Sequence, residues 1–189
     1  MRRYLLFILL ILLLSSGIGL YFFNEYWIHR YDEIIARQSV IYRLDKNLVW
    51  SVIYEETYFR AWMLGAADEV GLMQVTPIVA KEWAKETGFK EFEKQTSENL
   101  IEFLRDPERN IQIGCWYLEK LGEKYRDFPA EKAMTLAAYN AGPSRVEEWT
   151  KDVQPEKLSE AEFIERIGIS STKSYVSSIL ERYKNLKKE

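Results

Sequence analysis

One glutamate occupies a position where an amphipathic helix carries an apolar side chain. Val49, Val52, Ile53 and Glu56 follow one another at i, i+3, i+4 and i+7, so Glu56 shares the apolar face. The adjacent Glu55 is rotated about 100° around the helix, toward its more polar side. A carboxyl group packed against hydrocarbon has a raised pKa, because desolvation penalises the anion. The spacing singles out Glu56 as a candidate general acid, although a glutamate that ends its helix and turns into solvent has the same spacing.

The composition excludes several other kinds of chemistry. The chain has one cysteine, Cys115, and one histidine, His29, which rules out an internal disulfide and a His-based metal cluster. A Ser-His-Asp triad would have to use His29. We expect Cys115 to be a core residue and His29 to lie at the surface or at a membrane interface. Because 26 Lys and Arg stand against 29 Asp and Glu, the formal charge is −3, which argues against a nucleic-acid binder.

Two further segments combine small residues with polar side chains. The segment 71–74 reads G-L-M-Q and follows a stretch rich in Ala and Gly, where a glycine beside an amide lets a polar ligand approach the backbone. A buried turn with Leu72 and Met73 in the core explains the same residues. The segment 137–143 reads A-A-Y-N-A-G-P, which is typical of a closely packed helix end, but that reading does not explain why Tyr139 and Asn140 stand together.

The N-terminus is long and apolar enough to cross a membrane. The 20 residues from Tyr4 to Phe23 carry no charge and would span roughly 30 Å as a helix. A cleaved signal peptide is the competing interpretation, because Ser15, Ser16 and Gly17 follow a leucine run, but the apolar stretch continues past them. We therefore expect residues 1–24 to form an uncleaved signal anchor. Arg2 and Arg3 would then remain in the cytoplasm, with the rest of the chain outside.

Three-and-four spacing of apolar residues recurs along the remaining chain, and no long alternating segment predicts a sheet. The sequence therefore predicts an all-α fold with at most a minor β element. We expect a membrane-proximal helix within 25–41, extending toward residue 43, and one domain over 42–189. Once residues 1–24 with Arg2 and Arg3 are set aside, the outward-facing part of the chain carries a charge of −5. A capping box at Ser159 opens one helix. The other expected helices cover residues 45–56, 78–87, 107–126, 129–139, 144–150 and 172–183.

Taken together, the motifs resemble those of the lytic transglycosylase family, relatives of goose-type lysozyme. The first motif of the family matches residues 43–57, where R-L-D is followed by the apolar pairs 48–49 and 52–53 and by Glu56-Thr57. G-L-M-Q matches 71–74, N-x-x-x-G matches Asn110 and Gly114, A-Y-N-A-G matches 138–142, and T-x-x-Y-V matches Thr172, Tyr175 and Val176. The five motifs occur in order over residues 42–183.

The resemblance implies a lysozyme-like α-helical catalytic domain that acts on peptidoglycan. It assigns the catalytic acid to Glu56 and implies substrate-binding roles for Met73, Gln74, Tyr139, Asn140 and Tyr175. Whereas ordinary glycosidases use two carboxylates, this family uses one: Glu56 would protonate the β-1,4 glycosidic oxygen and then accept a proton from the 6-hydroxyl of muramic acid, leaving a 1,6-anhydro end. No metal or organic cofactor is implied.

The sequence also departs from the family pattern. Gly65 stands where many members have a serine that contacts the reacting sugar, Ser171 where members often have a second glutamate, and Arg60-Ala61 where the family has N-P. A lysozyme-like hydrolase is the first alternative, with Asp68 or Glu69 as the second carboxylate. A non-catalytic peptidoglycan-binding scaffold is the second alternative.

The resemblance and the apolar N-terminus together predict a location and partners. We expect a single-pass protein of the cytoplasmic (inner) membrane, with its domain on the periplasmic side. The expected partners are peptidoglycan glycan strands, the membrane and envelope machinery that must cross the wall.

Overall fold

Helices account for nearly all regular structure in the computed structural model, which describes residues 2–89 and 95–188. The only β elements in these ranges are isolated bridges that pair Val70 with Leu64 and Val75, so the all-α prediction is confirmed. The elements in chain order are α1 Arg2–His29, α2 Asp32–Ile41, α3 Lys46–Thr57, α4 Pro77–Thr87, α6 Ser97–Leu104, α7 Pro107–Tyr125, α8 Glu131–Ala141, α9 Pro143–Thr150, the 3-10 turn η1 Pro155–Lys157, α10 Glu160–Arg166 and α11 Ser170–Leu186.

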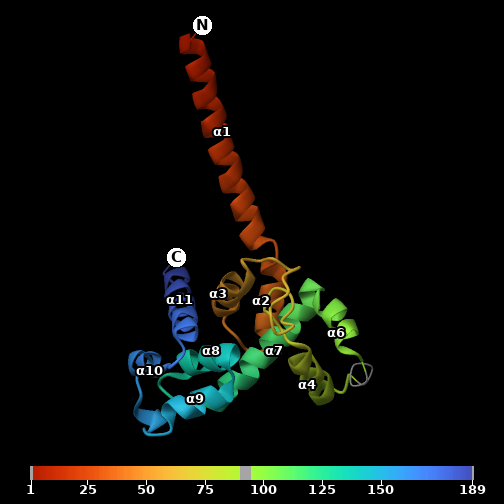
Figure 1. Cartoon of the computed structure of the whole chain (residues 1–189), viewed down its shortest axis with the longest axis vertical. Helices are drawn as coiled ribbons and strands as arrows, with labels where there is room; N and C mark the ends of the chain where they lie inside the picture. Colours follow the sequence, from red (N-terminus) through yellow and green to blue (C-terminus); the bar gives the residue numbers. More distant parts are fainter. Residues whose placement is uncertain (1, 90–94, 189) are drawn as a thin grey trace.

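The long helix α7 runs through the middle of the domain and contacts α2, α4, α6 and α8 (Figure 1). Helix α8 in turn contacts α9, α10 and α11, and α11 packs along α3. The helix that carries Glu56 is therefore held between the chain's second and last helices. Residues more than a hundred positions apart meet at that contact.

Local sequence signals set several helix ends. Asp45 caps α3 by accepting a hydrogen bond from the Asn47 N–H at 2.9 Å, and Asp106 caps α7 in the same way. Ser159 and Glu162 form the predicted capping box of α10. Helix α4 ends at Gly88, whose φ of 74° is left-handed and suits glycine.

The predicted apolar faces point into one core. On α3, Val49, Val52 and Ile53 are fully buried, and the core extends over α7 and α8. The predicted face of α11 is buried along its whole length, through Tyr175, Val176, Ile179, Leu180 and Tyr183. Cys115 lies in the core, as expected, and burial raises the pKa of its thiol.

The structure differs from the sequence prediction at two places. The helix expected over 25–43 is interrupted at Arg30 and Tyr31, so its first part continues α1 and its second part is α2. Helix α6 was not predicted, because eight residues show barely two turns of periodicity. Its Leu100 and Leu104 are both fully buried.

Helix α1 projects away from the other helices and leaves its apolar side chains exposed (Figure 1). By length and composition it can cross a membrane, a test that a signal sequence also passes. His29, in its last turn, is half exposed, and its Nδ1 lies 2.7 Å from Oδ2 of Asp32, which agrees with the expected surface position.

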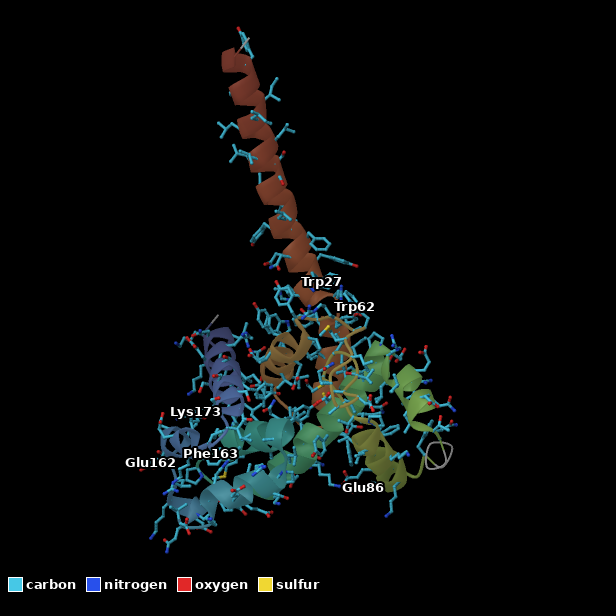
Figure 2. All side chains as sticks on the ribbon, viewed as in Figure 1. Trp27, Trp62, Glu86, Glu162, Phe163 and Lys173 are labelled. Atoms are coloured by element: carbon cyan, nitrogen blue, oxygen red, sulfur yellow. The ribbon has the colours of Figure 1, made fainter. Side chains whose placement is uncertain are left out.

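The lower end of α1 is docked on the domain through polar and aromatic contacts. Trp27 donates a hydrogen bond from Nε1 to the Tyr58 carbonyl oxygen at 2.9 Å, and its ring meets that of Trp62 edge-on at 5.7 Å (Figure 2). Arg30 donates to the carbonyl of Phe59 and lies 3.4 Å from the centre of the Trp27 ring. The backbone that receives α1 follows directly after the end of α3.

Candidate active site

Glu56 lies in the last turn of α3, on the face that Val49, Val52 and Ile53 bury. Its side chain is therefore partly buried, on the face that the spacing predicted. The hydroxyl of Tyr175, from α11, donates a hydrogen bond to Oε1 of Glu56 at 2.6 Å. This short bond fixes the carboxyl group at the contact between α3 and α11.

Burial raises the pKa of Glu56 to about 7, because a buried carboxylate loses its hydration. The hydrogen bond from Tyr175 opposes this rise by stabilising the anion, while the charges of Glu69 and Glu55 add to it. Near neutral pH the group is divided between its acid and its carboxylate form. A residue that must first donate and later accept a proton works best with such a pKa.

Glu55 has a different environment from its neighbour. Its Oε2 accepts a hydrogen bond from Nη1 of Arg182 at 3.0 Å, and this guanidinium also lies over the Tyr54 ring at 4.0 Å. Glu55 is thus paired with a cation, whereas Glu56 is bonded to a neutral phenol. The rotation of one residue around the helix separates the two carboxylates, as predicted from sequence.

Three side chains from three helices hold the backbone of residues 71–74. The Thr57 hydroxyl donates to the Leu72 carbonyl at 3.0 Å, and the Tyr139 hydroxyl donates to the Met73 carbonyl at 2.7 Å. Asn110 accepts from the Met73 N–H at 2.8 Å and donates to the carbonyls of Val70 and Leu104. The motifs that are far apart in sequence therefore meet on one loop beside Glu56.

The conformation of this loop requires two glycines, Gly71 in the loop itself and Gly114 on α7. Gly71 has a φ of 72°, and a Cβ there would lie 2.5 Å from Nδ2 of Asn110. A Cβ on Gly114 would lie 2.5 Å from Sδ of Met73, so this glycine makes room for the methionine. Gln74 has a φ of 47°, which is unusual for a residue with a side chain and commonly marks a functional site.

The predicted substrate-binding residues fall into two groups. Gln74 is partly exposed, with Nε2 donating to the Gly71 carbonyl, and Asn140 is exposed, with Oδ1 accepting from the Thr172 hydroxyl at 2.7 Å. Met73, by contrast, is fully buried, and Tyr175 is nearly so. The side chain of Met73 therefore fixes the loop from inside, and only its neighbour Gln74 reaches solvent.

Tyr139 and Tyr175 both act as hydrogen-bond donors in this site. Burial raises the pKa of each phenol well above its ordinary value, and the Glu56 charge adds to this rise. Both hydroxyls therefore keep their protons over the pH range in which Glu56 titrates. Tyr175 contacts the acid itself, whereas Tyr139 contacts the loop next to it.

Of the two acidic residues that precede the loop, only Glu69 is coupled to Glu56. Its charge raises the pKa of Glu56, and its Oε2 accepts a hydrogen bond from the Ala67 N–H at 2.8 Å. Asp68 is exposed and has a φ of 60°. Sequence reasoning did not separate the two, and it gave no structural role to the Thr57 hydroxyl, although Thr57 directly follows the acid.

The acidic, histidine and cysteine side chains of the described residues do not gather into a metal site. In the ranges 2–89 and 95–188, no group of three His, Cys, Asp or Glu side chains is placed to hold a metal ion.

Known proteins are similar to this chain in sequence and in fold. A family model described as "Transglycosylase SLT domain" matches residues 33–161. The soluble lytic murein transglycosylase of Escherichia coli K12 is 27% identical over 150 residues, which cover 79% of this chain and 22% of that protein. The membrane-bound lytic murein transglycosylase C of Photorhabdus laumondii is 28% identical over 122 residues, 62% of this chain and 33% of that protein.

A solved structure agrees with these matches. The 70 kDa soluble lytic transglycosylase of Escherichia coli superposes with a TM-score of 0.69 and 25% identity, over 83% of this chain and 24% of that chain. The matched part of this chain thus spans between 22% and 33% of the length of these relatives. Because the family model covers more than half of the sequence, the chain belongs to the transglycosylase SLT domain family.

Proposed function

We propose that this chain is a membrane-anchored peptidoglycan lytic transglycosylase. In this proposal it cleaves the β-1,4 bond between N-acetylmuramic acid and N-acetylglucosamine and leaves 1,6-anhydro-muramic acid ends. The observation that carries the proposal is Glu56, which is partly buried, has a pKa of about 7 and is bonded to Tyr175 beside the loop 71–74. The names of the relatives, lytic murein transglycosylases, support the same reaction.

The reaction needs one group that both gives and takes a proton. In its acid form Glu56 donates its proton to the glycosidic oxygen while the C1–O bond breaks. As a carboxylate it then accepts the proton of the muramic acid 6-hydroxyl while that oxygen bonds to C1. The proton that Glu56 loses is thus replaced, and no water is consumed.

The other predicted residues have supporting roles in this proposal. Tyr175 positions the Glu56 carboxyl and stabilises its anionic form. Tyr139 and Met73 fix the loop 71–74, and Gln74 and Asn140 offer exposed amides to the sugar substituents. These two amides would hydrogen-bond the polar substituents of the sugar rings, as polar side chains do in other ligand sites.

Product analysis tests the proposed reaction. The full chain is incubated with purified peptidoglycan sacculi, and the soluble fragments are examined by mass spectrometry. We expect anhydro-muramyl ends from the parent protein, none from Glu56→Gln and near-parental amounts from Glu55→Gln. Inactivity of Glu55→Gln with retained activity of Glu56→Gln would refute the assignment of the acid.

A lysozyme-like hydrolase is the alternative that one observation favours. Glu69 lies close enough to raise the pKa of Glu56, and a second carboxylate could activate a water molecule. Reducing muramic acid ends in the same experiment would identify the hydrolase. Binding to sacculi without any product would identify the non-catalytic scaffold.

The proposed location follows from α1. In this proposal α1 crosses the cytoplasmic membrane once, Arg2 and Arg3 stay in the cytoplasm, and residues 42–189 act on the periplasmic side. The membrane-bound relative supports anchoring. Envelope machinery that must pass the wall is a partner class consistent with such a site. Retention of the full chain in the membrane fraction after a carbonate wash, and its release after removal of residues 1–24, tests the anchor.

A further inference from the structure

The side chain of Glu69 occupies space that exists only because residue 65 is a glycine. A Cβ added to Gly65 would lie 2.3 Å from Oε2 and 3.1 Å from Cδ of Glu69, so the Glu69 side chain would have to move. The same Cβ would lie 2.9 Å from Oε1 of Gln74. The Glu69 carboxylate therefore lies against the Gly65 backbone, in the neighbourhood of the partly exposed Gln74 amide.

The local backbone holds Glu69 in this place. Gly65 N–H donates to the Glu69 carbonyl at 2.7 Å, and Val70 pairs with both Leu64 and Val75. The Ala67 N–H donates to Oε2 of Glu69 at 2.8 Å. No salt bridge involving Glu69 occurs in the part of the chain that the structure describes, although eleven ion pairs of Lys or Arg with other carboxylates do. Its second oxygen, Oε1, accepts no hydrogen bond from these residues.

The ionisable groups around Glu56 come from its own helix, from α8 and α11, and from the loop before Gly71. Glu55 lies on the same helix and is neutralised in part by Arg182, and α8 and α11 contribute the neutral phenols of Tyr139 and Tyr175. Glu69, on the loop before Gly71, is thus the one acidic group without a cationic partner among the described groups coupled to Glu56. In the proposed reaction Glu56 gives its proton to the glycosidic oxygen while the C1–O bond breaks. Positive charge then develops on the sugar close to this loop.

We propose that Glu69 is a second carboxylate of the active site, which contacts the sugar at the cleaved bond and stabilises the positive charge that develops there. This inference rests on the proposed function. Glu69 forms no bond to C1 and moves no proton in this role, so the products remain anhydro ends. The Glu69 charge also keeps Glu56 in its acid form to higher pH, because like charges disfavour ionisation.

Substitutions at residues 65, 68 and 69 test the role of Glu69. Glu69→Gln keeps the shape and the acceptor for the Ala67 N–H but removes the charge. Asp68→Asn is the matched control, since it removes a charge from the adjacent exposed residue. Gly65→Ala leaves both carboxylates in the chain but places a methyl group where Oε2 of Glu69 now lies.

The measurement is the initial rate of anhydro-muropeptide release from sacculi as a function of substrate and pH, with the full chain in detergent. We expect Glu69→Gln to lower kcat about 10- to 100-fold with little change in KM, as for the loss of one preorganised charge-stabilising group. The upper pH limit of its activity should also move to lower pH. Asp68→Asn should keep the parental kcat and pH limit.

The effect of Gly65→Ala should depend on whether residue 69 is a glutamate. Gly65→Ala should lower kcat in the parent, but should change it little in the Glu69→Gln background, because both act through the same carboxylate. Equal rates and pH limits for Glu69→Gln and Asp68→Asn would overturn the inference. A shifted pH limit without a loss of kcat would overturn the substrate contact.

The outcomes separate this inference from the proposed function. Reducing ends from the parent protein would refute the transglycosylase reaction regardless of any Glu69 variant. Anhydro ends at parental rate from Glu69→Gln would refute only the role of Glu69. Melting curves of each variant identify any loss of rate that comes from unfolding.

Discussion

The Tyr175 hydroxyl donates a hydrogen bond to Oε1 of Glu56 at 2.6 Å, across 119 positions of the chain. The two residues come from α11 and α3, so the bond exists only when these helices are packed together. Folding of the last helix therefore completes the environment of the candidate acid. The geometry of this one bond makes the first prediction possible.

Tyr175→Phe should lower kcat roughly 10-fold or more, because a hydrogen bond to a charged group contributes about 1.5–3 kcal/mol. Since Tyr175 favours the carboxylate form of Glu56, its loss should raise the pKa of Glu56 and move the upper pH limit of activity to higher pH. A pH–rate profile on sacculi measures both effects. A limit that moved to lower pH would contradict the bond as described.

Glu56→Gln should change the pH dependence of stability as well as abolish cleavage. The folded chain holds the Glu56 proton up to about pH 7, whereas the unfolded chain releases it near 4.5, so parental stability falls as pH rises through this interval. A glutamine has no such loss. From acidic to alkaline pH, the free energy of unfolding of Glu56→Gln should therefore rise by roughly 3 kcal/mol relative to that of the parent.

Chemical denaturation of both proteins across this pH range measures the difference. Glu55→Gln is the control, because Glu55 forms a salt bridge with Arg182 and should show no such gain at high pH. A constant difference between Glu56→Gln and the parent at all pH values would show that the carboxyl is solvated.

Asn110→Ala should destabilise the fold by roughly 3 kcal/mol or more, because each buried polar group left without a partner costs about 1–3 kcal/mol. The Met73 N–H and the carbonyls of Val70 and Leu104 would all lose their partner. Thermal unfolding measures the loss. Asn99→Ala is the control, since Asn99 is exposed and its side chain bonds Gln95 alone among the described residues. Equal effects of the two substitutions would contradict the role of Asn110 in holding the loop.

Two glycines of α7 should respond in opposite directions to alanine. Gly114→Ala places a methyl group 2.5 Å from Sδ of Met73 and should cost about 1–3 kcal/mol through overpacking. At Gly122 the nearest atom would be 3.9 Å away, so Gly122→Ala should stabilise the helix by up to about 1 kcal/mol. Denaturation midpoints of the pair decide the matter, and a neutral Gly114→Ala would show that Met73 can move aside.

The sequence was sufficient to place Glu56 on the buried face of its helix but not to give its surroundings. Helical phase placed Glu56 on the buried face and Glu55 on the other, since both depend only on the local 3.6-residue period. The role of Glu69 depends on how residues 64, 70 and 75 pair, which no local period reveals. Likewise, the turn at Arg30 and Tyr31 has no Gly or Pro to announce it, and it forms where α1 docks on the turn after α3.

The docking of α1 also has a mechanical consequence for the proposed membrane protein. Trp27, which is bonded to the domain, lies only four residues or about 6 Å beyond Phe23, the last apolar residue of the stretch that begins at Tyr4. A flexible linker would let the domain change its distance and orientation relative to the bilayer. Helix α1 is instead bonded to the Tyr58 carbonyl, two residues after Glu56 in the sequence, so in the proposed membrane protein the candidate acid stays at a fixed distance from the lipid surface.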